Sequence, residues 1–585
     1  MIAKTEDPEK LLTRRMLETF GVASSEELTR ERIKYGPMSK AYLGLAARIV
    51  DSSGVVARLD EWDAARRKSG AGRKPTIPYR AVLILLLIHI QMGLGANYQE
   101  IANTLQYRFD AEHRSILGIT DAVTSRTGWY QRMRRSTVNL LNLMDPYPSR
   151  RNKRLDQAEF AEQRNKWDSV EGRLATKIAM VKLDWMCEQL VHATVRMLPA
   201  DIWARYKGNI AIDATKLEIA GRPNSPDVRR KRTNADPFAE RYRREGNHNG
   251  EGAKTDVAAY ELENAVMVWN NPGERHLFPS LTLAVTFHQP GRLVGHGLRL
   301  VESVERLGVR PGMIMADRAY NGEQAKNFQI PVRLKGWKLA IDYKKDDLGI
   351  QSEYKDLILV EGTWYVATMP ENLIEGMKAI RSEVEDPDTG EKRTLIDEQA
   401  LQTLLKNRKP YRMLPKGRPD ADGYQRYSYP RPGTYIAYDR GSKKMITPST
   451  PGTITIPIDA GTPPKGKKRK ENPPAVKYRQ EFPYMSPEHQ AFYGMRSLVE
   501  SSHKMLKEAG REDIANKRKR SGRGYAFHYL AAALAAASTN LRKIESFFVQ
   551  DYERSVEPKH RVRRRKTLTG TALARTATTA TAPPA

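Results

Sequence analysis

The stretch GMIMADRAYNG, residues 312–322, is the one that decides the fold class of this 585-residue chain. Its first half is an apolar run of the kind that forms a buried central strand, and the run ends at an acid, Asp317. Chemistry in open α/β sheets gathers at such strand ends. A lone acid after a strand is more often a cap or a turn residue, so the surrounding segments have to support a functional role.

The segments around this stretch predict an α/β layout with a mixed sheet. Three β-rich runs precede it, an amphipathic helix follows them, and PVRLKG after it predicts the start of a further strand. These segments are NIAIDATKLEI (209–219), ELENAVMVWNN (261–271), SLTLAVTFHQP (280–290), GHGLRLVESVERLG (295–308) and PVRLKG (331–336). Three strands, a helix and a strand that ends in an acid are typical of an α/β domain.

The first of these strands carries a second acid and is followed by a basic loop. Asp213 alternates with Ile210 and Ile212, so it faces away from the side that those residues bury. The loop before the second strand is rich in cations: Arg229, Arg230, Lys231 and Arg232, then Arg241, Arg243 and Arg244. A charge run is usually solvated, but its place beside Asp213 makes phosphate contacts a candidate role.

Composition points to a polyanionic partner. The 98 Lys and Arg against 69 Asp and Glu give a formal net charge of +29, which attracts nucleic acid over distances set by screening. The length suggests two to four domains at roughly 150 residues each. The single cysteine, Cys187, excludes disulfides within the chain and cysteine-rich zinc sites, so metal chemistry would use carboxylates or histidines. Its apolar helical surroundings favour a packed core thiol.

No membrane partner is expected. The longest apolar run, residues 81–94, is too short to cross about 30 Å of hydrocarbon and predicts a buried helix. The first residues lack the apolar region of a secretory signal. We therefore expect a cytoplasmic, nucleoid-associated protein.

The pattern between residues 40 and 144 is helical, and its last segment is arginine-rich. This segment, residues 119–144, carries Arg126, Arg132, Arg134 and Arg135 at the start of an apolar helix. Such an arrangement fits a helix-turn-helix DNA reader, and it fits a plain helical bundle with a solvated basic face equally well.

Composition shifts divide the chain into five parts. They are a helical DNA-binding region (1–150), linking helices (151–205), an α/β core (206–340 with 481–550), a mainly β insertion closed by a basic linker (341–480) and a disordered basic tail (551–585). Within the insertion Trp364 could stack on an unpaired base, although a Trp in a β-run is more often part of a core.

The stretch YGMRSLVESSHKMLK, residues 493–507, places five polar side chains on one side of a predicted helix. Tyr493, Arg496, Glu500, His503 and Lys507 share an arc of about 80°, opposite an apolar arc that includes Val499 and Leu506. A solvated amphipathic helix is the alternative, but such a face seldom needs Tyr, Arg and Lys around one Glu.

This spacing resembles a family signature. Tyr493, Arg496, Glu500 and Lys507 match the YREK signature of bacterial insertion-sequence transposases of the DDE type, and ADRAYNG resembles the strand and turn of the family's second Asp. Ala319 stands where many relatives have Gly. The resemblance covers about residues 209–548 and is looser for the N-terminal helices. It implies a ribonuclease-H-like catalytic core with an inserted domain.

The resemblance also implies a site. Asp213, Asp317 and Glu500 would be the catalytic, metal-binding triad, and Tyr493, Arg496 and Lys507 would hold the backbone of the transposon end. Converging carboxylates repel one another, and two Mg²⁺ ions, for which Mn²⁺ substitutes, would resolve this with hard oxygen ligands. The residues implied in end recognition are those of the helical region and the basic loop: Arg132, Arg134, Arg135, Arg229, Arg230, Lys231 and Arg232.

Two-metal cut-and-paste transposition of double-stranded DNA by a homodimer is therefore the expected function. A catalytically idle DNA-binding regulator and a nuclease on the same core are the alternatives. Two roles remain possible for His503: it contacts the scissile phosphate, or it only supports neighbouring residues of the site.

Overall fold

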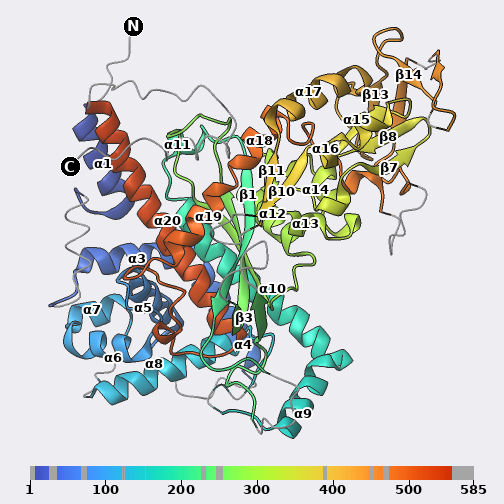
Figure 1. Ribbon diagram of the computed structural model, residues 1–585. Helices are drawn as coiled ribbons and strands as arrows, with labels where there is room; N and C mark the ends of the chain where they lie inside the picture. Colours follow the sequence, from blue (N-terminus) through green and yellow to red (C-terminus); the bar gives the residue numbers. More distant parts are fainter. Residues whose placement is uncertain are drawn as a thin grey trace, which may run out of the picture.

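The computed structural model describes residues 7–24, 36–67, 75–120, 123, 125–149, 151, 153–224, 232–244, 254–385, 392–439, 441–447, 452–464 and 473–556. The protein is a mixed α/β molecule built around one mixed six-stranded sheet. Figure 1 shows the sheet at the centre, helices from the N-terminal region on one side, and the segment that follows strand β6 (Lys338–Ile341) extending to the upper right.

The predicted helical region consists of several short helices. They are α1 (Pro8–Phe20), α3 (Lys40–Ser52), α4 (Val55–Arg66), α5 (Tyr79–Gln91), α6 (Tyr98–Tyr107), α7 (Ala111–Ile116) and α8 (Arg126–Leu141). The apolar run at 81–94 forms the buried helix α5, as predicted. Ser125 caps the arginine-rich helix α8 by accepting a hydrogen bond from the N–H of Gly128.

A long C-terminal helix joins these helices to the sheet. An Ala-rich segment forms the start of α20 (Tyr525–Val556), which packs against α1, α5, α10 (Val170–Val195) and strand β4 (Thr282–His288). Small side chains such as Ala533 and Ala536 are fully buried, because only they let neighbouring elements approach α20 this closely. Cys187 of α10 is fully buried, which confirms the predicted core thiol. The helical region and the sheet thus share one hydrophobic cluster.

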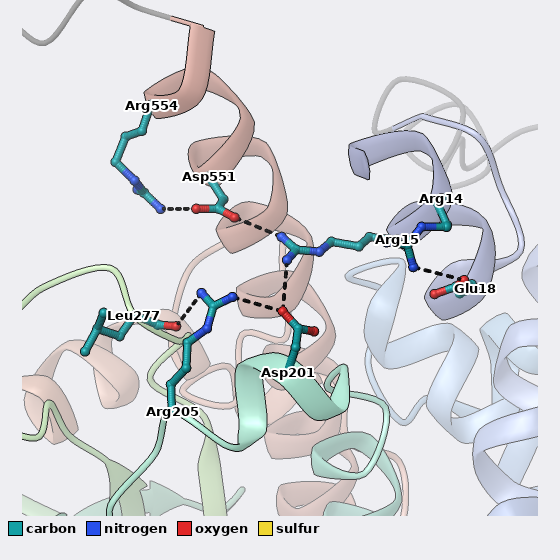
Figure 2. Close-up of polar contacts among 8 residues, drawn as sticks. All are labelled: Arg14, Arg15, Glu18, Asp201, Arg205, Leu277, Asp551 and Arg554. Atoms are coloured by element: carbon teal, nitrogen blue, oxygen red, sulfur yellow. Dashed lines mark hydrogen bonds and ion pairs between the residues drawn. The ribbon is translucent and has the colours of Figure 1, made fainter. Parts of the chain in front are cut away.

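Buried Arg15 ties α1 to distant parts of the chain. Its guanidinium pairs with Asp551 of α20 at 2.8 Å and with Asp201 of α11 (Ala200–Trp203) at 3.4 Å. Arg205 also pairs with Asp201, at 2.9 Å, and Arg554 pairs with Asp551 (Figure 2). A charge with a side chain only 7% exposed needs such partners, so α1 docks in one orientation.

The central sheet has the strand order β2-β3-β1-β5-β6, with β4 paired to β3. Its strands are β1 (Ile210–Glu218), β2 (Glu240–Arg244), β3 (Thr255–Met267), β4 (Thr282–His288), β5 (Met313–Ala316) and β6 (Lys338–Ile341). β1 is antiparallel to β3 and parallel to β5, which is parallel to β6. The crossover from β4 to β5 is α12 (His296–Arg306), as the amphipathic pattern predicts.

Two details of this region correct the predictions. PVRLKG does not begin a strand: it lies in and after α14 (Gln329–Leu334), and β6 begins only at Lys338. Pro331 stands near the start of α14, where a missing N–H costs no helical hydrogen bond. The basic segment between the first two predicted strands is not all loop, because residues 240–244 form β2 on β3.

The segment after β6 has its own hydrophobic cluster and is mainly β, as predicted. Its strands are β7 (Ile350–Tyr354), β8 (Leu357–Val360), β9 (Thr363–Val366), β10 (Arg381–Glu385), β11 (Lys392–Ile396), β12 (Leu414–Pro415), β13 (Gln425–Ser428), β14 (Ala437–Tyr438), β15 (Met445–Ile446) and β16 (Thr453–Ile456), with α15 (Glu371–Ile374), α16 (Gly376–Ala379) and α17 (Glu398–Arg408). Trp364 is 3% exposed within this cluster, so base stacking by its ring is wrong and the core role is confirmed.

The stretch 493–507 is not one helix. α18 (Pro487–Gly494) ends just inside this stretch. α19 (Ser497–Leu506) begins after a turn at Met495 and Arg496. The N–H groups of Met495 and Arg496 bond to carbonyls three residues back rather than four, which tightens the chain at this point.

Candidate active site

The register of the parallel strands brings two of the predicted acids together. Ile212 of β1 pairs with Ala316 of β5, so Asp213 and Asp317, one residue further on each strand, lie beside each other. Ala211, Met313 and Met315 lie two or four residues before these acids, on the same face of the sheet, and pack under Met495 and Val499. Asp213 and Asp317 therefore point to the face of the sheet that α18 and α19 cover.

Arg496 joins Asp213 to the third predicted acid. Its Nη1 lies 3.0 Å from Oδ2 of Asp213 and its Nη2 lies 2.6 Å from Oε1 of Glu500. Glu500 lies one turn further along α19 and is 54% exposed, whereas Asp213 and Arg496 are 19% and 18% exposed. The turn before α19 thus places a guanidinium between two carboxylates.

The electrostatics of Asp213 resemble those of a functional acid. Burial raises the pKa of Asp213 to about 6, against the opposing effect of Arg496, and Asp317 and Glu263 raise the pKa further. Its Oδ1 accepts a hydrogen bond from the N–H of Ala214 at 2.9 Å. A carboxyl that is costly to ionise, next to another acid, is a site where a cation would be stabilising.

Two other residues of the YREK pattern flank this cluster. The Tyr493 ring lies 5.8 Å from the Arg496 guanidinium and stacks on the ring of His489. Burial raises the pKa of Tyr493, so its hydroxyl keeps its proton at neutral pH. Lys507 ends α19 in a half-buried position, where burial and the neighbouring Lys216 lower its pKa. A desolvated cation of this kind favours an anionic partner.

His503 does not share the presenting face of α19. It is 8% exposed and lies with the packing side chains Val499, Ser502 and Leu506. Burial lowers the pKa of His503 to about 3, so the ring is neutral, and its Nε2 has no hydrogen-bond partner among the described residues. His503 lies four residues after the buried Val499, so it belongs to the packing side of α19 and not to the exposed side that carries Glu500.

The structure adds polar residues beside Asp213 that the sequence pattern did not single out. Asn264 of β3 lies directly opposite Asp213, is fully buried, and has no partner for either amide atom in the described part of the chain. Glu263 lies opposite Ala214 and accepts hydrogen bonds from Tyr320 and, at 2.9 Å, from His288. The sequence around Asn264 and Glu263 is typical of an ordinary buried strand. Only the register of β3 on β1 shows that these two residues lie beside Asp213.

The donor set fits hard divalent cations. Asp213, Asp317 and Glu500 offer carboxylate oxygens, and the unpartnered amide of Asn264 lies beside them. As placed, no group of three or more His, Cys, Asp or Glu side chains in the described residues forms a ready metal cluster. Arg496 occupies the position between Asp213 and Glu500 and supplies the neutralising charge instead.

The other predicted DNA contacts lie away from this cluster or outside the described residues. Arg132, Arg134 and Arg135 lie on α8, where Arg132 donates a hydrogen bond to Thr76 at 2.8 Å and Arg135 is exposed. Arg232 is exposed, and its backbone forms an isolated antiparallel β-bridge with Asp156. Arg229, Arg230 and Lys231 lie outside the described residues.

Among the described residues, no helix combines the length and apolar character needed to cross a membrane. Comparison with known proteins found no protein-family model that matches this chain and no curated protein with significant sequence similarity to it.

Proposed function

We propose that this chain is a DNA transposase that cuts at the ends of its own insertion sequence and joins the freed 3′-hydroxyl groups to target DNA. The observation that carries the proposal is the convergence of three distant acids. Asp213 on β1 and Asp317 directly after β5 lie side by side. Glu500 on α19 pairs with Arg496, which also pairs with Asp213.

The strand order supports a ribonuclease-H-like core. Read from β4, the strands run β4-β3-β1-β5-β6, with the first three antiparallel and the last two parallel to β1 and to each other. Acids on the central strand and at the end of its parallel neighbour then face one covering helix, and the segment between β6 and α18 is the insertion that the resemblance implies.

Asp213, Asp317 and Glu500 would hold two Mg²⁺ ions, or Mn²⁺ in their place. Ions bound there would supply activation of an attacking water or 3′-hydroxyl and stabilisation of the leaving oxygen in an in-line displacement at phosphorus. The protein's own groups do the positioning. Once the carboxylates have other partners, the planar guanidinium of Arg496 is free to hold a phosphate in two parallel hydrogen bonds.

Tyr493 and Lys507 are the other two residues that would bind the DNA backbone. Tyr493 retains its proton and donates one hydrogen bond, and the half-buried Lys507 regains a counter-charge when a phosphate approaches. These contacts position the strand and carry no sequence information. Recognition of the ends falls to the helical region, with Arg132, Arg134 and Arg135, and to the basic segment that includes Arg232. Two copies, one for each end, form the proposed complex.

The test is strand cleavage on DNA that carries the inverted repeats flanking the gene, with Mg²⁺ or Mn²⁺. Glu500→Gln removes a metal-binding charge and keeps the volume, so we expect cleavage to fall by at least about 100-fold. Glu553→Gln, an exposed position on α20, is the matched control and should cut normally.

The alternatives give different results. Equal cleavage by Glu500→Gln and the parent would contradict the assignment. Full biological function after loss of all three acids would identify a DNA-binding regulator, and cleaved ends that are never joined to target DNA would identify a nuclease.

A further inference from the structure

The first half of α10 carries a stripe of large apolar side chains that face solvent. They are Val170, Leu174, Ile178 and Val181, each between 51% and 71% exposed. Their spacing of four, four and three residues places them within an arc of about 80° on the helix surface. Figure 1 shows this part of the molecule, with the neighbouring α9 (Gln157–Asp168), at the lower right. Single exposed apolar residues are ordinary, but a continuous stripe of them marks an interaction surface.

The other side of the same half of α10 makes the contacts with the rest of the protein. The hydroxyl of Thr176 donates a hydrogen bond to the carbonyl of Pro146 at 2.9 Å, and the sulfur of Met180 accepts one from the hydroxyl of Tyr525 at 3.6 Å. Thr176 and Met180 lie about 110–160° around the helix from the centre of the stripe. The described part of the chain therefore packs against one side of this helix and leaves the apolar side uncovered.

One turn further along, a helix covers the same side of α10. Trp185 continues the stripe four residues after Val181, and its ring lies edge-to-face with that of Trp62 on α4, at 5.8 Å between centroids. The guanidinium of Arg58, also on α4, lies 5.9 Å from the centre of the Trp185 ring. Side chains three and four residues apart form the ridges that pack into the grooves of another helix. The uncovered part of the stripe has this spacing, so a further helix is the element that fits it.

Two charged residues on one flank of the stripe indicate which helix this is. Glu171 and Lys182 lie near its opposite ends and within about 20° of each other around the helix axis. Neither forms an ion pair with a described residue, and the ammonium of Lys182 lies 5.1 Å from the centre of the Trp62 ring. A second copy of α10, antiparallel and related by a two-fold axis, places Glu171 of each copy level with Lys182 of the other. Opposite charges then meet twice across one interface.

The same register makes the apolar side chains interlock. Leu174 lies between Ile178 and Val181 of the partner copy, as the side chains of antiparallel helices do when they interdigitate. The exposed Lys177 borders the stripe on the other flank, where its long side chain keeps the ammonium in solvent. The stripe presents on the order of 400 Å² per copy, about half of the roughly 800 Å² that each partner gives to a standard interface. We therefore expect a dissociation constant on the order of 10 µM.

We propose that the exposed side of α10 is a homodimer interface, in which the Val170–Val181 segments of two copies pack antiparallel across a two-fold axis. This contact would join the two copies of the proposed transposase, and the proposal rests on that function only for its use. Self-association is measured without DNA or metal. It can therefore fail while strand cleavage stands, and strand cleavage can fail while it stands.

Sedimentation equilibrium of the full-length protein without DNA, over about 1–100 µM, tests the proposal. The parent protein should dimerise. Leu174→Glu/Ile178→Glu should weaken dimerisation at least about 30-fold, because it places carboxylates in the apolar centre of the interface. Leu414→Glu/Met445→Glu makes the same change in charge at exposed apolar positions of the inserted segment, and its dissociation constant should stay within about twofold of the parent value.

Charge exchange on the flank tests the antiparallel pairing. Glu171→Lys and Lys182→Glu should each weaken dimerisation at least about threefold, since two attractive pairs become repulsive. The double exchange Glu171→Lys/Lys182→Glu keeps the net charge and should restore the dissociation constant to within about threefold of the parent value. Circular dichroism melting curves check that every variant is folded.

Three results would overturn the proposal. The first is a parent protein that stays monomeric at about 100 µM, which would leave the stripe to a different partner. The second is a dimer that Leu174→Glu/Ile178→Glu leaves intact, because such a dimer uses another surface. The third is a folded double exchange that associates no better than the two single exchanges.

Discussion

Arg496 is the residue on which the candidate active site depends. Its ion pairs to Asp213 and Glu500 hold two acids together that would otherwise repel, in a position where burial makes charge expensive. The same guanidinium belongs to the signature that resembles phosphate-holding residues. A single cation placed between the acids offsets part of their negative charge.

The raised pKa of Asp213 predicts a pH-dependent cost in stability. Its folded-state pKa of about 6 exceeds the usual 3.8, so the ionised group destabilises the metal-free protein above pH 6, and the cost disappears below pH 3.8. Asp213→Asn should therefore raise the free energy of unfolding at pH 7.5 by about 1–2 kcal/mol, less than the full shift implies because Arg496 loses a partner.

Urea unfolding with a chelator present, at pH 7.5 and at pH 4, measures this difference. Glu553→Gln is the control and should change nothing at either pH. A stabilisation by Asp213→Asn that is the same at both pH values would show that the carboxyl is not the cause.

His503 gives a second prediction at this scale. The neutral ring is buried with an unpartnered Nε2, so His503→Leu should keep stability or raise it by about 1 kcal/mol, and should leave strand cleavage within about threefold. Thermal melting and the cleavage assay are the measurements. A folded variant with a tenfold loss of cleavage would instead place His503 in the reaction.

At the scale of elements, α20 is the piece that fixes the sheet against the helices. Its buried Asn540 replaces a strand partner for β4: Oδ1 accepts from the N–H of Thr282 at 2.8 Å, and Nδ2 donates to the Thr282 carbonyl at 2.8 Å. Nδ2 also lies 3.1 Å from the hydroxyl of Thr194 on α10. One side chain therefore joins three elements.

Asn540→Leu should be strongly destabilising. It leaves the buried backbone groups of Thr282 without partners, which costs about 2–4 kcal/mol in the free energy of unfolding. Urea unfolding measures the loss, and Gln550→Leu at an exposed position of the same helix is the control. A change below about 0.5 kcal/mol would mean that water satisfies those groups.

At the scale of the whole molecule, the inserted segment leaves and rejoins the sheet at one place. Gln480 accepts from the N–H of Ile341 at 2.9 Å and donates back to its carbonyl, and Glu481 bonds to Leu339. The segment also has a hydrophobic cluster separate from that of the sheet and helices. Adjacent ends and a separate core are what an insertion into an existing fold requires.

Replacement of residues 345–476 by a Gly-Ser linker of about five residues should leave a folded core. The Tyr343 hydroxyl bonds to the carbonyl of Tyr478, so a short linker can span the gap. Circular dichroism and cooperative urea unfolding, compared with the full-length chain, are the measurements. An aggregated or non-cooperative product would show that the two clusters stabilise each other.

Local patterns in the sequence determined much of the core. The strand that precedes Asp317, the strand that holds Asp213 and the buried helix α5 all follow from the pattern of apolar residues, because each pattern reports how one element is buried. The same reasoning failed at PVRLKG, where a short apolar run is compatible with either a helix or a strand.

Only the tertiary structure decided how these pieces meet. The register of β1 on β5 places Asp213 beside Asp317, and the turn at Met495 and Arg496 sets the guanidinium between two acids. The packing of α19 against its neighbours buries His503. The physical reason is that periodicity encodes the burial of a single element. The distances between charged groups depend on register and packing, which involve partners that local sequence does not name.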